Sequence, residues 1–256
     1  MFLYRYDTPE YLQYLFEQTH YNFMDVWQAA KSVPAKAAAF GFVSHNEEWG
    51  IDSTAHISGI TFGQGEGYVI AKANELALIL EPILAANGLP ITGQVVVDIA
   101  HEFVEYGVDI LMKNIDPKLG AKIVRAAAPP NPNIPLVVEQ AFVKGFAEEF
   151  GLPLPDARKY FKSSERQFRQ ILILYGQALM EDTDTAVEML AEHLAEIATA
   201  FLEAYGITLP PGVDITPLAQ AGIYLAMDLC AEDFAPEVMA TSVFVQEQLQ
   251  VHGISY

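Results

Sequence analysis

The sequence has one cysteine, few basic residues and no long apolar run, and each shortage excludes a class of protein. Cys230 is the only cysteine, so the chain forms no intramolecular disulfide, and its apolar neighbours indicate a buried structural thiol. No segment reaches the roughly 18 uninterrupted apolar residues of a membrane-spanning helix, so we expect no integral membrane segment. The first residues lack the basic-then-apolar pattern of a signal peptide, and we therefore expect a cytoplasmic protein.

Positive charge is the second shortage. The chain has 14 Lys and Arg against 33 Asp and Glu, which gives a formal net charge of −19, and residues 170–256 contain no Lys or Arg. Nucleic acids and anionic membranes bind proteins chiefly through Lys and Arg, so this composition argues against nucleic acid as a partner. A short basic stripe is interpreted as a solvated face paired with the acidic C-terminal helices, the alternative being a docking face for an anionic ligand or another subunit; its members are Lys159, Lys162, Arg166 and Arg169.

Hydrophobic residues make up 52% of the chain, and most of them recur at helical spacing. Convincing alternating strands are absent, and the pattern predicts an all-α fold of about eight to ten helices. The expected helical segments are 11–30, 35–43 continuing towards 56, 67–86, 92–113, 116–128, 136–150, 156–180, 184–205 and two more ending near 252. Four prolines among residues 129–135 predict a surface loop within a single domain that covers residues 1–256.

One expected helix has potential metal ligands along one side. If residues 41–56 form a continuous helix, His45, Asp52 and His56 project within about 20° of one line, because each residue turns about 100°. Imidazole and carboxylate groups on an apolar helix are costly to bury unless something satisfies them, and a metal ion does so directly. The alternative for each histidine is an ordinary hydrogen-bonded core residue.

A second expected helix repeats this pattern. His101 and Glu105 are one helical turn apart and can chelate a single ion, and Asp98 precedes them as a ligand or as an acceptor that fixes the imidazole. On a further helix, His20 lies beside Asp25. The conjunction of these segments predicts a metal site, although a histidine and a glutamate one turn apart also form surface ion pairs.

Together these residues resemble a known family. The run from Gly41 to His45, then Asp52, His56, and His101 with Glu105 on a later helix, is similar to the all-helical zinc-dependent phospholipase C family, whose fold is shared by fungal single-strand nucleases. Two features depart from the family pattern. Trp49 stands where the family usually has its aspartate, and the chain begins at Met1 where the family uses a processed amino terminus as a zinc ligand.

The resemblance implies a phospholipase C-like helical bundle and a zinc-dependent hydrolase. It implies about two Zn²⁺ ions held by metal ligands His20, His45, Asp52, His56, His101 and Glu105. Asp52 or Asp25 would bridge the ions or act as the catalytic general base, and the substrate would be a small phosphoester or lipid headgroup. Two alternatives stay open: a non-catalytic helical protein with a remnant metal site or none, and a helical di-iron redox protein, because Glu17 and Asp98 each precede a histidine by three residues.

Overall fold

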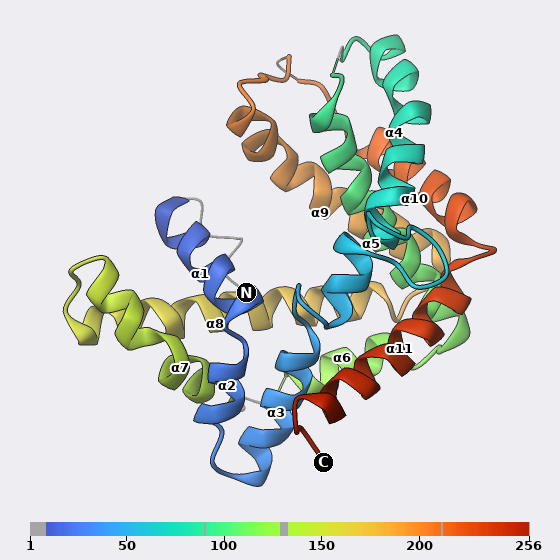
Figure 1. Ribbon diagram of the computed structural model, residues 1–256. Helices are drawn as coiled ribbons and strands as arrows, with labels where there is room; N and C mark the ends of the chain where they lie inside the picture. Colours follow the sequence, from blue (N-terminus) through green and yellow to red (C-terminus); the bar gives the residue numbers. More distant parts are fainter. Residues whose placement is uncertain (1–8, 90, 129–132, 211, 256) are drawn as a thin grey trace. The chain divides into compact units, whose positions relative to one another are not determined.

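The computed structural model describes residues 9–89, 91–128, 133–210 and 212–255. Within these ranges the chain forms eleven α-helices and one π-helix and has no strand, which confirms the all-α prediction (Figure 1). The elements are α1 (Pro9–Tyr21), α2 (Met24–Ala29), α3 (Val33–Ser44), the π-helix η1 (Ser53–Ile57), α4 (Tyr68–Ala86), α5 (Gln94–Ile115), α6 (Leu119–Ala127), α7 (Asn133–Glu149), α8 (Leu154–Ala178), α9 (Thr183–Ala204), α10 (Thr216–Cys230) and α11 (Phe234–Val251). Among the helices so described, none is long and apolar enough to cross a membrane.

The chain divides into two compact units, which are described separately. The first unit combines residues 1–54, 124–174 and 241–256, and the second combines residues 55–123 and 175–240. The expectation of one domain stays a prediction, because a pair of compact units occurs both in one-domain and in two-domain proteins.

Aromatic side chains form the centre of the first unit. Phe146 of α7 is fully buried, and its ring lies 4.9 Å from Tyr11 of α1, 5.0 Å from Phe150 and 5.3 Å from Tyr160 of α8, measured between ring centroids. Rings at these separations contribute to stability beyond the apolar area that they bury. Helices α2 and α3 pack against α7 at the same core.

Helix α5 organises the second unit, where α4, α9 and α10 pack around it. Its buried row includes Val96, Ala100 and Val104, which are spaced by four residues and therefore share one face. His101 and Glu105 lie about 100–140° around the helix from Ala100. The apolar spacing that buries one side of α5 thus places the two polar side chains together on another side.

Two predicted helices differ from the structure, and each difference has a local cause. The helix expected over 11–30 is interrupted after Tyr21, because Phe23 turns into the core and meets the ring of Trp49 at 5.1 Å. The helix expected to continue to His56 ends at Ser44, so the prediction of one continuous stripe over 41–56 is wrong.

Residues 133–135, predicted as part of a proline-rich loop, instead form the first turn of α7. Proline is tolerated there, because the backbone N–H groups of a first turn have no partner within the helix. The rest of the predicted loop, residues 129–132, lies outside the described residues.

The basic stripe lies on α8. Arg169 pairs with Glu165 of the same helix at 3.2 Å, and the other three side chains are exposed. The interpretation of a solvated face agrees with this exposure, while its pairing with the acidic C-terminal helices stays a prediction.

The close packing of α10 against α5 in the second unit can be tested by substitution. A Cβ atom on Gly222 would lie 2.3 Å from the ring of Phe103, so we expect Gly222→Ala to lower the free energy of unfolding by about 1–3 kcal/mol through overpacking. Gly41→Ala is the control, because that exposed position of α3 has nothing within 4 Å of an added Cβ, and the change should instead stabilise by about 0.5–1 kcal/mol. Urea unfolding measures both, and equal effects of the two substitutions would contradict the packing.

Candidate metal centres

The chain between α3 and η1 is shaped by one buried amide. The side-chain oxygen of Asn46 accepts hydrogen bonds from the backbone N–H groups of Glu48, Trp49 and Gly50 at 2.9–3.0 Å, and its amide group donates to the carbonyl of Val43. A Cβ on Gly50 would lie 2.4 Å from the Asn46 backbone nitrogen. The turn therefore requires both residues, and it is the physical reason why the helix expected over 41–56 stops.

This turn belongs to the first group of potential ligands, which we define as His20, Glu47 and Asp52. One donor atom from each side chain lies within 4.8 Å of the others, and Glu47 and Asp52 are buried. His20 comes from the last turn of α1, and its carbonyl accepts a hydrogen bond from the Glu47 N–H at 3.4 Å. His20 Nε2 lies 3.7 Å from Asp52 Oδ2.

The ring of His20 is oriented for ligation. Its Nδ1 lies 2.8 Å from the carbonyl oxygen of Phe16, and its ring stacks on the Phe16 ring at 3.9 Å. Because a carbonyl only accepts, Nδ1 carries a proton, and Nε2 is the nitrogen that faces Asp52. A backbone carbonyl behind one nitrogen is the usual arrangement that fixes a metal-ligating histidine.

His45 has a different position from the one predicted. It caps the end of α3, its side chain is 63% exposed, and its Nδ1 lies 2.6 Å from Asp52 Oδ2. The hydrogen bond to Asp52 raises the pKa of His45 above 6.5. His45 is therefore placed as a partner of the Asp52 carboxylate, outside the first group.

This ion pair can be tested without metal. In metal-free protein, an NMR titration should give His45 a pKa above the ordinary 6.5, and Asp52→Asn should return it to 6.5 or below. Since the folded-state pKa is raised, the contribution to stability is present below pH 6.5 and is lost as the pH rises through the folded-state value. An unchanged His45 titration in Asp52→Asn would contradict the pairing.

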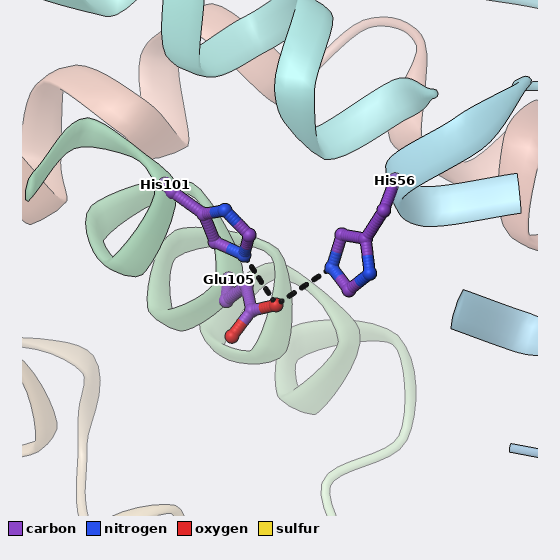
Figure 2. Close-up of side chains that lie close together, drawn as sticks. All are labelled: His56, His101 and Glu105. Atoms are coloured by element: carbon purple, nitrogen blue, oxygen red, sulfur yellow. Dashed lines mark hydrogen bonds and ion pairs between the residues drawn. The ribbon is translucent and has the colours of Figure 1, made fainter. Parts of the chain in front are cut away.

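Figure 2 shows the second group, which we define as His56, His101 and Glu105. His101 and Glu105 come from one side of α5, and His56 reaches them from η1. Glu105 Oε1 lies 3.0 Å from His101 Nε2 and 3.5 Å from His56 Nε2, so two imidazoles share one carboxylate oxygen. The predicted pairing of His101 with Glu105 one turn later is thus present in the structure.

The two imidazoles control the charge of Glu105. Burial raises the pKa of this carboxyl, but hydrogen bonds from His101 and His56 outweigh it and bring the pKa down to about 2. Glu105 therefore stays ionised at any pH at which histidine binds a metal. Deprotonated carboxylate and neutral imidazole are the forms that ligate metals.

Three of the donor separations are close to those around a tetrahedral ion. Ligands about 2.0–2.2 Å from zinc in a tetrahedral set lie roughly 3.3–3.6 Å from one another. The 3.0 and 3.5 Å separations in the second group, and the 3.7 Å separation of His20 from Asp52, are close to this range. Two histidines and one glutamate are also a donor set of catalytic zinc sites, in which the fourth position stays open for water or substrate.

Residues of the predicted stripe belong to different groups. Asp52 belongs to the first group and His56 to the second, while Asp25 is exposed in the first turn of α2 and belongs to neither. Asp98 accepts hydrogen bonds from Gln94 and from the hydroxyl of Tyr205, which occupy both its carboxylate oxygens.

Sequence reasoning missed Glu47. Its only signal was an acidic residue directly after Asn46, and helical spacing gave no reason to choose it over Glu48. Its burial follows from the Asn46 turn, which no periodic pattern reveals.

Comparisons with protein-family models, curated proteins and solved structures found no match to this chain. The arguments about its function therefore begin from the two groups themselves.

Proposed function

We propose that this protein is a zinc-dependent hydrolase that acts on a small phosphoester or lipid headgroup. The observation that supports this most directly is the second group, where His56, His101 and Glu105 supply the donor set of a catalytic zinc site. The first group, His20, Glu47 and Asp52, would hold a further ion. The resemblance of these segments to the phospholipase C family agrees with two ions and with this substrate class.

The charge of the protein is consistent with the proposal. A phosphoester is anionic, and the chain has a net charge of −19. Bound Zn²⁺ would supply the positive charge, polarise the phosphoryl oxygen and lower the pKa of a coordinated water. The residues contribute orientation: the carbonyl of Phe16 sets the ring of His20, and His45 holds the carboxylate of Asp52.

Asp52 is the better placed of the two predicted catalytic carboxylates. It is buried, it lies against His20 and His45, and it belongs to the first group, whereas Asp25 is exposed. Whether Asp52 bridges ions or accepts a proton from water, a position beside the ion is required for either role. We therefore propose Asp52 alone for this role.

The alternatives are less favoured by the geometry. A di-iron site needs carboxylate-x-x-His pairs, but Asp98 is engaged by Gln94 and Tyr205, and Glu17 does not join His20 in the first group. A metal site that only stabilises the fold would use the same residues, so activity must be measured separately from binding.

Metal content tests the binding half of the proposal. We expect His56→Ala and His101→Ala each to remove about one zinc per chain, and the double variant to remove no more, because the ligands share one ion. Elemental analysis at pH 7.5 measures this, and zinc should also dissociate as the pH falls through about 6.5, where protons compete for imidazole.

His193→Ala is the control, because His193 lies near Glu196 outside both groups and its loss should leave the zinc content unchanged. Unchanged zinc in His56→Ala and His101→Ala would contradict the proposed ligands. Iron in place of zinc would favour the di-iron alternative.

Hydrolysis of a chromogenic phosphodiester, bis(p-nitrophenyl) phosphate, tests the catalytic half. We expect zinc-loaded protein to hydrolyse it and Glu105→Gln to lower kcat/KM about 100-fold or more, because an amide is a weaker zinc ligand than a carboxylate. Glu102→Gln, one residue from His101 but outside the group, is the matched control. Full zinc content without hydrolysis of this diester or of phospholipid headgroups would favour the non-catalytic alternative.

A further inference from the structure

The loop that follows His56 is attached to a distant glutamate. Glu237 lies in the first turn of α11 and is only 3% exposed. Its Oε1 accepts the backbone N–H of Ile60 at 2.6 Å, and its Oε2 accepts the N–H of Thr61 at 2.6 Å and of Phe62 at 3.1 Å. The Thr61 hydroxyl donates to Oε2 as well, at 2.7 Å.

These four hydrogen bonds fix both the position and the orientation of the loop. A buried carboxylate needs its oxygens satisfied, and three consecutive backbone N–H groups satisfy it only when they converge on one point. An amide in the same place could not do so, because its NH₂ group would face N–H donors. The loop therefore depends on the carboxylate and not merely on the size of the side chain.

Backbone hydrogen bonds within the loop over residues 58–67 converge on one carbonyl oxygen. The carbonyl oxygen of Gly63 accepts hydrogen bonds from the N–H groups of Gly59 and Glu66, both at 3.1 Å, and of Gly67 at 2.7 Å. Residues 60–62, held by Glu237, are therefore linked to Gly67 through a single carbonyl.

Gly67 in turn lies against the backbone that holds His56. A Cβ on Gly67 would lie 2.4 Å from the carbonyl oxygen of Ala55 and 2.5 Å from the carbonyl carbon of His56, and its φ of +82° is a conformation that favours glycine. The end of the loop thus packs directly on the π-helix, where any displacement of the loop would move His56.

From these contacts we infer that Glu237 is a positioning residue for the metal ligand His56, acting through the backbone of residues 58–67. The inference rests on the proposed zinc site. His101 and Glu105 need no such support, because the turn of α5 sets their separation. His56 comes from a separate segment, and its approach to Glu105 depends on what holds η1 and the following loop.

The test compares three substitutions in the full-length protein. Glu237→Gln removes the convergent acceptor, Thr61→Val removes only the hydroxyl bond, and Glu232→Gln changes an exposed carboxylate on the preceding turn as the matched control. Chelator competition measures the zinc affinity of each site. The site that is lost in His101→Ala is assigned to the second group. The visible absorption of Co²⁺ in the same site reports its coordination, which a change in stability alone would leave unaltered.

We expect Glu237→Gln to weaken zinc binding at the second group about 10- to 100-fold, as loss of groups that orient ligands does, and to reduce the Co²⁺ absorption. Thr61→Val should weaken binding by a smaller factor, and Glu232→Gln should leave it unchanged. Wild-type affinity and an unchanged Co²⁺ spectrum in Glu237→Gln would overturn the inference. If Glu237→Gln does not fold, Thr61→Val serves as the test. Wild-type zinc affinity in Thr61→Val would then overturn the inference.

Hydrogen exchange separates this inference from the proposed function. The amides of residues 55–62 should exchange faster in Glu237→Gln than in wild type, with or without metal. A wild-type protein that binds no zinc refutes the proposed function, and the positioning role is then judged by exchange alone. Equal exchange rates in the two proteins would refute the positioning role whether or not zinc binds.

Discussion

A shortage of cations is the constraint on which the rest of the structure depends. With 33 acidic and 14 basic side chains, most carboxylates must be satisfied by something other than Lys or Arg. In the second unit, tyrosine hydroxyls donate to aspartates in the pairs Tyr175–Asp109, Tyr205–Asp98 and Tyr224–Asp184, while Asp233 accepts from Tyr68 and also pairs with Lys72. Backbone N–H groups satisfy Glu237, and imidazoles satisfy Glu105 and Asp52. The two groups of potential ligands belong to this wider pattern of neutral donors around acidic acceptors.

The kind of donor decides how readily each carboxylate ionises. Burial raises the pKa of Asp109 to about 6 although Tyr175 donates to it, whereas the two imidazoles at Glu105, one turn earlier on α5, bring the pKa down to about 2. An imidazole can become a cation and a phenol cannot, so only the first stabilises a neighbouring negative charge strongly. A carboxylate that accepts from a tyrosine hydroxyl raises the pKa of that tyrosine. The hydrogen bond to Asp184 raises the pKa of Tyr224 to about 12. Along α5, Glu105 thus stays ionised even in acid, whereas Asp109 takes up a proton near pH 6.

Periodic features could be predicted from the sequence, and features that depend on a single side chain could not. The helical spacing of α5 was sufficient to pair His101 with Glu105, because one turn separates them in any α-helix. The same reasoning failed over 41–56, where the side chain of Asn46 competes with the helix for three backbone N–H groups and turns the chain. That turn buries Glu47 and ends the helix that was expected to align His45 with His56. The loop on Glu237 has no local signal, since its partners are 175–177 residues apart.

This separation has a consequence for the order in which the molecule forms. His101 and Glu105 meet as soon as one turn of helix exists, on a time scale of microseconds or less. The hydrogen bonds between residues 60–62 and Glu237 close a loop of more than 170 residues, which is entropically costly and slow, and on the ribosome they form only after Glu237 has been synthesised. The loop that supports His56 is therefore fixed later than the pair of His101 and Glu105. Until then His56 is not held beside His101 and Glu105, so the second group of potential ligands is completed only with the rest of the second unit.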